Sequence, residues 1–356
     1  MLVLVTGASG YVGCHTVRAV TADDHRVRAF VRRPAKLQAA LEPLGVDPDL
    51  VEVVVGDATD TASVQAAVTG VDAVVHTAAV YETSARFHDV IRQTNVTAAR
   101  LVLDAAVAAG ADPVVHVSSI VALMSGPPGA PISPDVEPVA APVPGAYVTS
   151  KADSDRLARA YQDRGAPVVI TYPGAVMGPH DPSLGRNAWA LRQYLRGQLP
   201  VAPDVTLAVT DVRDIGHLHA RLLQPGLGPR RYLAAGDMAY FPDLCRAVAA
   251  AAHRRLPVLE VPVGLVERVS GRLDPINKRL PGRGTGLDAE FGWFLARLGP
   301  WHDQATRTDF GIDPVPAETS FIDTARWLAQ TGHLTHSQAG SLLETPALPA
   351  LSAPSR

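Results

Sequence analysis

The chain has 356 residues, of which 47% are hydrophobic, and carries a formal net charge of −3. The length supports a large core, and the slight negative charge argues against a surface that binds nucleic acid or another polyanion. Two cysteines exclude a disulfide framework and no run of eighteen apolar residues predicts a membrane span, so we expect a cytoplasmic protein.

The N-terminal segment combines a short apolar run with evenly spaced glycines. Residues 1–5 predict a buried strand, and Gly7, Gly10 and Gly13 precede a stretch with helical periodicity. A glycine turn between a strand and a helix N-terminus exposes backbone N–H groups and the positive end of the helix dipole, which suit a pyrophosphate. The alternative is an ordinary turn. The predicted cofactor-binding residues of this loop are Gly7, Ser9, Gly10, Tyr11, Val12 and Gly13.

Short valine-rich runs then alternate with longer helical segments. Buried strands that alternate with helices predict a parallel sheet covered on both faces, that is, a doubly wound α/β fold of the Rossmann type. Ligands bind such sheets beyond the carboxyl ends of the strands, so the residues at these ends are the candidates. The later strands are predicted over 27–31, 51–55, 73–76, 114–117 and 168–172, and two of the helices over 89–109 and 147–164.

The end of the second predicted strand indicates which dinucleotide binds. A carboxylate there would accept hydrogen bonds from the ribose hydroxyls of NAD and would repel the additional phosphate of NADP. Arg32 and Arg33 stand there instead, and a guanidinium binds a phosphate through paired donors. The residues therefore favour NADP, with NAD the less expected cofactor. The alternative is that both arginines are solvated loop residues.

Small and polar residues follow the third and fourth predicted strands. Asp57 can accept a hydrogen bond from the adenine amino group, or it can serve as a helix cap or turn residue. Thr77, Ala78 and Ala79 are small enough for a ribose to lie against the backbone, although small residues are also common there for packing. We expect these residues, and Ala58 beside Asp57, to contact the cofactor.

A serine, a tyrosine and a lysine carry the predicted chemistry. The fifth strand ends in Ser118 and Ser119, and Tyr147 and Lys151 lie four residues apart on one helix face. Hydride transfer to a carbonyl carbon requires a proton donor for the oxygen, and an ammonium about 4 Å from a phenol lowers its pKa from about 10 to roughly 7. Each motif alone is an ordinary turn or a chance pair. The occurrence of both motifs in this order, after a nucleotide-binding loop in the chain, indicates a catalytic site.

These motifs together resemble the extended short-chain dehydrogenase/reductase family over roughly residues 1–330. The resemblance implies that Ser119, Tyr147 and Lys151 are catalytic, with Ser118 the less expected serine, and that Asn95 is a structural or water-binding helper. It also implies that Lys151 holds the nicotinamide ribose and that Pro173, Gly174 and Val176 contact the nicotinamide. The matching segments are Thr6-Gly7-x-x-Gly10-x-x-Gly13, Gly56-Asp57, Val117-Ser118-Ser119, Tyr147-x-x-x-Lys151, 173–179, and 210–215 with His219.

Some residues differ from the family's usual pattern and indicate which subclass of the family the chain resembles. Ile120 and Val121 stand where similar sugar-nucleotide dehydratases carry an acidic residue. The basic end of the second strand replaces the carboxylate that is typical of nucleotide-sugar epimerases. Residues 31–34 are instead similar to the dihydroflavonol reductase and cinnamoyl-CoA reductase branch, and residues 117–120 to that branch and its hydroxysteroid dehydrogenase relatives.

The chain is expected to form two units and a tail. Residues 1–176 form the NADP-binding domain and residues 177–335 a smaller substrate-binding lobe, of which 205–222 return to the Rossmann core. Residues 336–356, rich in proline and small residues, are expected to be disordered. The proline-rich loop 127–144 is either one lip of the substrate pocket or a surface spacer. The candidate lining residues are Tyr81, Met177, Trp189, Tyr194 and Phe291, although each of these types is more often part of a core than of a pocket. Arg186, Arg192 and Arg196 lie at near-helical spacing, which favours a solvated helix face over contact with an anionic substrate.

The sequence therefore predicts an NADP(H)-dependent oxidoreductase that acts on a ketone, aldehyde or secondary alcohol of a hydrophobic small molecule. The alternatives are a nucleotide-sugar epimerase with bound NAD and a non-catalytic NADP-binding redox sensor, although sensors of this family typically lose the tyrosine or the lysine. The histidines show no metal-ligand pattern, so no metal is predicted. The oligomeric state stays open, a homodimer included.

Overall fold

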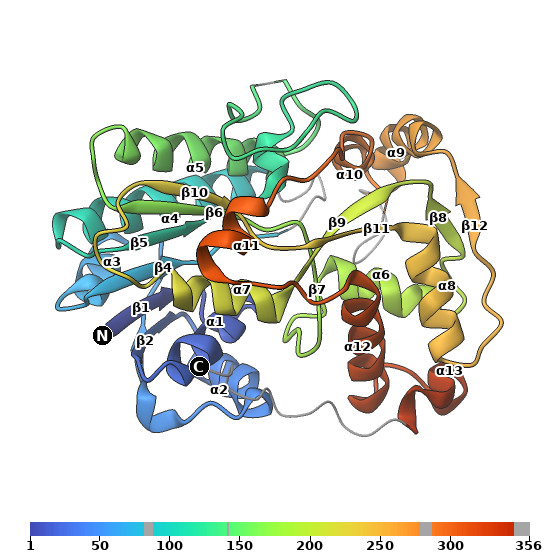
Figure 1. Ribbon diagram of the computed structural model, residues 1–356, viewed down its shortest axis with the longest axis horizontal. Coiled ribbons are helices and arrows are strands. Elements are labelled where there is room, and N and C mark those ends of the chain that lie inside the picture. Colours follow the sequence, from blue (N-terminus) through green and yellow to red (C-terminus); the bar gives the residue numbers. More distant parts are fainter. Residues whose placement is uncertain (82–87, 141, 278–286, 345–356) are drawn as a thin grey trace.

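The computed structural model describes residues 1–81, 88–140, 142–277 and 287–344. Its central element is a seven-stranded parallel sheet, counted over these residues. The strands are β1 (Leu2–Thr6), β2 (Arg26–Val31), β3 (Val51–Val55), β4 (Ala73–His76), β5 (Val114–Val117), β6 (Val168–Tyr172) and β10 (Arg230–Leu233). Their spatial order, β10-β6-β5-β4-β1-β2-β3, reverses direction between β1 and β4, as in a doubly wound fold (Figure 1). The predicted α/β fold class is confirmed.

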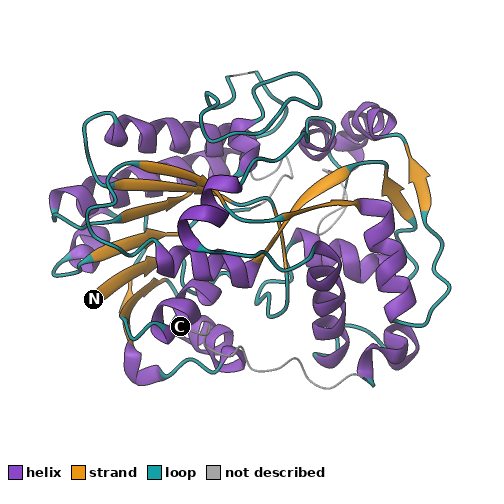
Figure 2. Cartoon of the chain, in the orientation of Figure 1, coloured by secondary structure: helices purple, strands orange, loops and turns teal. Residues whose placement is uncertain are grey.

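Helices cover both faces of this sheet because successive side chains of each strand point to opposite faces. Leu4, Val74 and Ile170 pack against α3 (Thr61–Val68), α4 (His88–Ala108) and α5 (Tyr147–Gln162). Val3 and Val115 pack on the other face, against α1 (Tyr11–Ala22), α2 (Pro34–Leu41) and α7 (Val212–Arg221) (Figure 2). The outer strand β3 is an exception to the predicted burial, since its Val53 and Val55 side chains are exposed.

The return to the Rossmann core differs from the prediction. Within 205–222, strand β9 (Thr206–Asp211) belongs to a separate sheet, between β7 (Ala175–Met177) and β11 (Asp237–Tyr240). Helix α7 packs on α1, and β10, which the sequence analysis did not predict, forms the edge of the central sheet beside β6. The returning segment is therefore 212–233 rather than 205–222.

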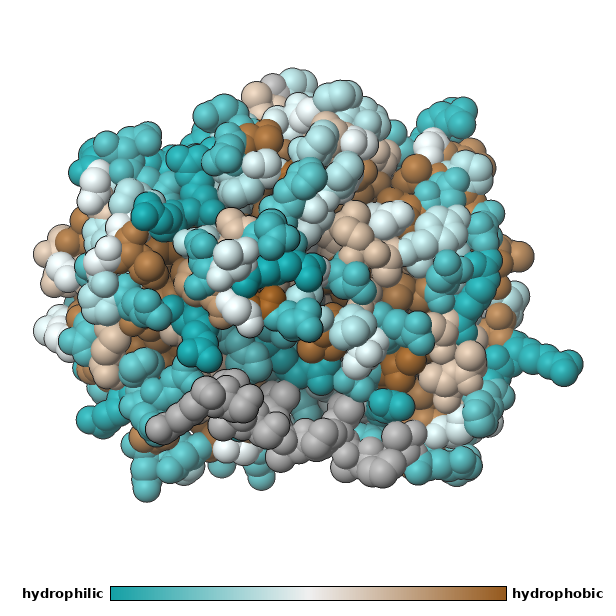
Figure 3. All heavy atoms as spheres, viewed as in Figure 1, coloured by the Kyte–Doolittle hydropathy of each residue, from teal (hydrophilic) through white to brown (hydrophobic). Residues whose placement is uncertain are grey.

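The smaller lobe has its own apolar core, which includes Leu195, Val248, Phe321 and Leu328. Apolar side chains also reach the surface of the molecule (Figure 3). In this lobe, Leu259 and Ile276 are exposed. The elements of this half are α6 (Arg186–Leu195), β8 (Val201–Pro203), α8 (Phe241–Ala251), β12 (Leu259–Val261), α9 (Val263–Asn277), α10 (Ala289–Leu295), α11 (Gln304–Phe310), α12 (Ala317–Gln330) and α13 (His336–Ala339). Short 3-10 helices cover Glu42–Leu44, Pro48–Leu50, Ile120–Leu123 and Gly340–Leu343.

Residues 336–344 are folded, so the prediction of a disordered tail from residue 336 is wrong for this part. Thr335 and Gln338 form a capping box that starts α13, and the Ser341 hydroxyl donates to the Ala251 carbonyl at 2.8 Å. Leu342 is buried in the small lobe's core. The buried Leu342 side chain and the helix cap at Thr335 stabilise this segment despite its composition. Residues 345–356 lie outside the described part of the chain.

Contacts between distant segments join the two halves. Arg213 bridges Asp211 and Asp323 at 2.7 and 2.9 Å, which ties α7 to α12. In the proline-rich loop, the Ile132 N–H donates to the Pro300 carbonyl at 2.8 Å, so this loop is attached to the segment before α11. Among the helices that the structure describes, none combines the length and apolarity needed to cross a bilayer.

Candidate active site

The glycine loop after β1 is shaped by close backbone contacts. Gly7 has a φ of +70° and its carbonyl accepts from the Gly10 N–H at 2.8 Å. A Cβ at Gly13 would lie 2.1 Å from the Gly7 oxygen, so a larger residue would push α1 away from the loop. Helix α1 has no side-chain cap at Gly10 and no acidic residue in its first turn. Its first N–H groups lack acceptors within the helix, and the loop therefore fits a pyrophosphate group.

The side chain of Tyr11 is engaged within the protein. Its hydroxyl donates to the Gly178 carbonyl at 2.6 Å, which joins α1 to the segment after β7. Burial, with Asp181 and Asp211 nearby, raises the pKa of this phenol well above its ordinary value. Only the backbone of Tyr11 is left to face a phosphate, beside Val12 and the half-buried Ser9.

The ends of β2 and β3 bring a basic and an acidic group together. Arg32 and Arg33 are exposed, and the Arg32 charge contributes to a lowered pKa of Asp57. The larger cause is Thr59, whose N–H and hydroxyl donate to Asp57 Oδ1 at 2.9 and 2.7 Å. Asp57 therefore forms the turn that was the alternative interpretation, with its second oxygen and the adjacent Ala58 at the sheet edge.

The end of β4 lies directly against the glycine loop. The Thr77 hydroxyl donates to the Thr6 carbonyl at 2.7 Å, and a Cβ at Gly7 would lie 2.8 Å from the Ala78 Cα. Two residues on, beyond Ala79, the Val80 backbone is held by Asn95 of α4, which accepts from its N–H at 2.7 Å and donates to its carbonyl at 3.1 Å. Asn95 also donates to the Ser150 hydroxyl at 3.1 Å, so it connects this edge to α5.

The two serines after β5 have different partners. The Ser118 hydroxyl donates to Asp155 of α5 at 2.8 Å, deep in the core. Ser119 instead lies near the Tyr147 phenol, whose pKa its side chain lowers, and its Oγ accepts from the Val121 N–H at 3.4 Å. Lys151, one turn after Tyr147, donates from Nζ to the Val117 carbonyl at 3.0 Å. The geometry therefore brings Ser119, Tyr147 and Lys151 together and directs Ser118 away from them.

The predicted lowering of the tyrosine pKa is wrong for the chain as the structure shows it. Burial raises the pKa of Tyr147, the Tyr81 phenol and Glu290 raise it further, and the Ser119 hydrogen bond opposes them. The ammonium of Lys151 is held by the Val117 carbonyl rather than by the phenol. Burial lowers the pKa of Lys151 to about 8 and Asp155 opposes this shift, so deprotonation of the lysine begins slightly above neutral pH.

Two stacked imidazoles lie near Lys151 in the sheet. The rings of His76 and His116 have centroids 5.6 Å apart, and the Thr6 hydroxyl lies 2.7 Å from His76 Nδ1. Burial and the Lys151 charge lower the pKa of His76 to about 3, so this imidazole is neutral. In the described part of the chain, no group of three or more His, Cys, Asp or Glu side chains is placed to hold a metal ion.

The residues predicted to contact nicotinamide lie where β7 begins. The Pro173 carbonyl accepts from the Ile120 N–H at 3.1 Å, next to Ser119. A Cβ at Gly174 would lie 2.2 Å from the Ala208 carbonyl of β9, so only glycine fits there. Val176 pairs with Thr210 in the small sheet, and its carbonyl accepts from Asn187 of α6. This segment therefore leads from the catalytic residues into the smaller lobe.

Only some of the predicted lining residues are available to a substrate. Tyr81 is 44% exposed and its ring packs on that of Tyr147, with centroids 4.8 Å apart. Trp189 and Phe291 are half-buried. Met177 and Tyr194 belong to the small lobe's core, so their prediction as lining residues is wrong. Helical periodicity had identified an apolar face but could not distinguish the core from a pocket wall.

Of the three arginines on and beside α6, two have partners in the protein. Arg186 forms an ion pair with Asp288 at 3.0 Å and stacks on the Phe291 ring at 4.4 Å. Arg192 donates to the His333 carbonyl at 3.2 Å. These two side chains thus stabilise the lobe rather than form the solvated face that helical spacing favoured.

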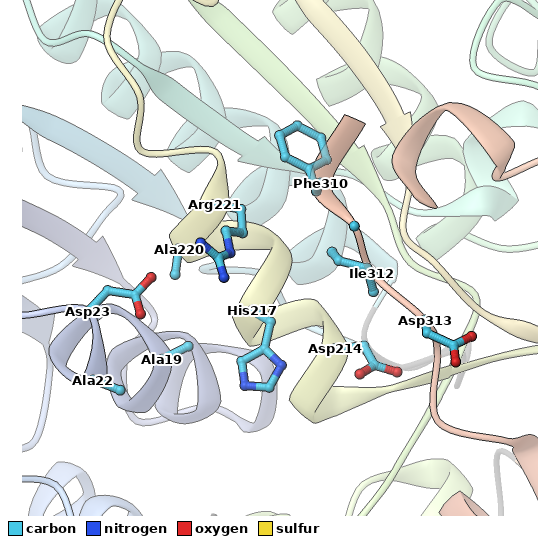
Figure 4. A pocket seen from close by; sticks show the side chains of 11 residues that line it. Ala19, Ala22, Asp23, Asp214, His217, Ala220, Arg221, Phe310, Ile312 and Asp313 are labelled. Atoms are coloured by element: carbon cyan, nitrogen blue, oxygen red, sulfur yellow. The ribbon is translucent and has the colours of Figure 1, made fainter. Parts of the chain in front are cut away.

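A pocket of about 180 Å³ lies elsewhere, between α1, α7 and the end of α11 (Figure 4). Asp214, His217 and Arg221 of α7 line it, together with Asp23 after α1 and with residues 310–313. None of the predicted catalytic or cofactor-binding residues lines this pocket. It is a polar seam between helices, away from the proposed chemistry.

Two residues of the site were missed by the sequence analysis. Asp155 accepts from Ser118 and forms an ion pair with Arg159 at 2.7 Å. The sequence could have indicated it, because residues four apart on a helix share a face and Asp155 lies four residues after Lys151. Glu290 of α10 accepts from the Val148 N–H at 2.7 Å, at the start of the helix that carries Tyr147. No local pattern indicates that contact, because 142 residues separate the partners.

Comparison with known proteins places the chain in a family. Residues 3–235 match the NAD dependent epimerase/dehydratase family, and the chain belongs to this family. The chain is 30% identical over 340 residues to sterol demethylase protein B of Methylococcus capsulatus, with 93% of this chain and 99% of that protein covered. It is also 30% identical over 348 residues to the dTDP-4-dehydro-6-deoxy-D-allose reductase of Streptomyces bikiniensis, covering 91% and 95%.

A solved structure shares the fold. The dTDP-glucose 4,6-dehydratase DesIV of Streptomyces venezuelae, with NAD and TYD bound, superposes with a TM-score of 0.71 at 22% identity, over 95% of this chain and 100% of that one. The resemblance to the extended short-chain dehydrogenase/reductase family is confirmed, and the chain is an oxidoreductase of the epimerase/dehydratase family.

Proposed function

We propose that this protein is an NADP(H)-dependent oxidoreductase that interconverts a ketone or aldehyde and the corresponding alcohol in a hydrophobic small molecule. The observation that carries the proposal is the cluster of Ser119, Tyr147 and Lys151 at the carboxyl end of β5, at the same sheet edge as the glycine loop. A bound nicotinamide supplies or accepts the hydride. Arg32 and Arg33 would bind the 2′-phosphate, and the loop residues, Asp57, Ala58 and residues 77–79 would contact the rest of the dinucleotide.

Each of the three clustered side chains has a distinct role in this reaction. Tyr147 gives its proton to the carbonyl oxygen as the hydride reaches the carbonyl carbon, and takes a proton from the alcohol in the reverse direction. Ser119 donates a hydrogen bond to the same oxygen and orients it. The Lys151 ammonium, which donates to the Val117 carbonyl beside this cluster, would bind the nicotinamide ribose. Asn95 acts as a positioning residue, since its amide joins the β4 edge to α5.

A hydrophobic substrate agrees with the residues next to Tyr147. The half-exposed Tyr81 ring packs on Tyr147, and Arg186 is paired with Asp288 and stacked on Phe291. The relative named as an allose reductase favours a second substrate class, a ketone on a nucleotide-linked sugar. Ile120 and Val121, both buried after Ser119, provide no acid for a dehydration.

Cofactor titration by fluorescence tests the proposal first, on protein stripped of nucleotide. We expect NADPH to bind at least about tenfold more tightly than NADH, a difference of about 1.4 kcal/mol. A panel of hydrophobic carbonyls and of dTDP-linked keto sugars then distinguishes the substrate classes. NAD that cannot be stripped, with epimerisation of a nucleotide sugar, would contradict the proposal. Binding of NADPH without turnover of any carbonyl would favour a redox sensor.

The arginines provide a sharper version of the same test. The double change Arg32→Ala with Arg33→Ala should weaken NADPH binding at least about tenfold and leave NADH binding unchanged, because only NADPH carries the 2′-phosphate. Arg26→Ala is the matched control, since Arg26 is exposed at the opposite end of the same strand. Equal losses for both cofactors would show that these arginines do not recognise the phosphate.

A further inference from the structure

The first turn of α5, the helix that carries Tyr147, donates a backbone hydrogen bond to a side chain of the smaller lobe. Helix α5 starts at Tyr147, and its N-cap residue, Ala146, has no side chain that could accept from the first turn. Glu290 of α10 fills that place, since its Oε1 accepts from the Val148 N–H at 2.7 Å. The backbone next to the proposed proton donor is therefore held by a residue of the small lobe.

The residue before the N-cap of α5 leaves space for the Glu290 carboxyl group. Gly145 has a φ of +93°, which favours glycine, and a Cβ there would lie 2.2 Å from the Glu290 carboxyl carbon. Any larger residue would displace the carboxyl group. Glu290 is 2% exposed, and its Oε2 is a buried oxygen without a hydrogen-bond partner. Such burial of an acid is costly, which argues that the contact serves a purpose.

The charges around Glu290 come from three elements. Burial and, to a smaller extent, Asp288 at the start of α10 raise the pKa of Glu290 to about 8, while the Val148 N–H, Arg186 of α6 and the Tyr147 backbone lower it. On the far side of α10, Glu267 of α9 is paired with Arg297 at 2.8 Å. The side chain is thus mostly protonated at neutral pH, and either form accepts from the backbone of α5.

We propose that Glu290 is a positioning residue for Tyr147, which holds the first turn of α5 so that the phenol stays against Ser119. This inference rests on the proposed function for the role of Tyr147 as the proton donor. The physical basis is that a helix N-terminus without acceptors frays, and Tyr147 is the first residue of its helix. Through Glu290, the packing of α10 against α9 reaches the catalytic helix (Figure 1).

Two substitutions separate the hydrogen bond from the charge. Glu290→Gln keeps an oxygen acceptor for Val148, whereas Glu290→Ala removes it. Glu267→Ala is the matched control, because it removes a carboxylate of the same lobe that pairs with Arg297 and not with α5. Hydrogen exchange of the amides of residues 146–149, measured by mass spectrometry, reports on the helix start without any need for turnover.

We expect Glu290→Ala to increase exchange at residues 146–149 at least about tenfold and to lower kcat at least about tenfold, with NADPH binding within about twofold of the parent. Glu290→Gln should restore exchange and kcat to within about threefold, and Glu267→Ala should change neither. If Glu290→Ala does not fold, Glu290→Asp serves instead, since its shorter side chain cannot reach the Val148 N–H.

Two results would overturn the inference. Unchanged exchange at residues 146–149 in Glu290→Ala would show that the contact does not hold the helix start. Equal losses of kcat in the Gln and Ala variants would show that the charge, not the acceptor, matters. A parent protein that reduces no carbonyl would contradict the proposed function alone, because the exchange measurement still decides the positioning role.

Discussion

The nucleotide-binding half and the smaller lobe place their functional side chains in different ways. In the first half, several candidates stand at strand ends: Gly7 follows β1, Arg32 follows β2 and Ser119 lies two residues after β5. Parallel strands bring these ends to one edge, so a local pattern is enough to place a residue in the site. In the smaller lobe, Glu290 and Arg186 owe their roles to partners more than 100 residues away.

The difference comes from the forces that determine each position. Strand ends in a parallel sheet are aligned by backbone hydrogen bonds, which depend little on side-chain identity. The side chains of the smaller lobe are placed by packing and ion pairs between α6, α9 and α10, which only the folded chain defines. We therefore expect substitutions in the first half to affect function specifically, and long-range contacts to affect the helix on which that function depends.

Removal of one hydroxyl should give the largest effect. Tyr147→Phe is expected to lower kcat by about 10²–10⁴-fold, because the proton donor is lost while the ring and its contact with Tyr81 remain. NADPH binding should stay within about threefold. Tyr161→Phe on the same helix is the control, since its hydroxyl donates to Asp104 instead. A Tyr147→Phe variant that kept more than about a tenth of the parent kcat would remove Tyr147 from the proposed mechanism.

The extent of sequence-based prediction shows the same division. The sheet, the glycine loop and the cluster around Tyr147 were predictable, because short apolar runs define the strands, the glycines and Ser119 stand at strand ends, and Tyr147 and Lys151 share one helix face. Asp155 was within reach of the same reasoning, since it lies on the same helix face as Lys151. The edge strand β10 was not, because its first two residues are arginines and it lacks the apolar pattern of a buried strand.

The remaining errors have physical causes. The pKa of Tyr147 was misjudged because burial depends on the whole fold, and the Val117 carbonyl binds the lysine. Met177 and Tyr194 were taken for pocket walls because apolar periodicity does not say what a face packs against. The folded residues 336–344 were missed because composition outweighed one capping box and one buried leucine.

Asn95 sharpens the comparison, because it belongs to the first half but acts through long-range contacts. Asn95→Ala removes three hydrogen bonds, two to Val80 and one to Ser150, and leaves buried polar groups without partners. We expect the free energy of unfolding to fall by about 1–3 kcal/mol and kcat to fall less than about tenfold. Chemical denaturation measures the first, with Gln93→Ala, exposed on the same helix, as the control. A large loss of kcat at unchanged stability would instead make Asn95 catalytic.

The smallest predicted effect is on the pH dependence of stability, and it comes from the pocket between α1, α7 and the end of α11. Burial and Asp211 raise the pKa of Asp214 to about 7, although its Oδ2 accepts from the Val315 N–H at 2.8 Å. The folded chain therefore holds a proton at Asp214 that the unfolded chain has already lost, so this residue's contribution to stability falls as the pH rises between about 4 and 7. In Asp214→Asn the amide oxygen can still accept from the Val315 N–H, and the side chain no longer titrates.

Relative to the parent, the free energy of unfolding of Asp214→Asn should rise by about 1 kcal/mol between pH 6 and pH 8, measured by thermal or urea unfolding. Asp23→Asn is the control, because Asp23 lines the same pocket and is not among the charges that shift the pKa of Asp214. A difference between Asp214→Asn and the parent that stays constant with pH would show that Asp214 is already ionised in the folded protein at pH 6.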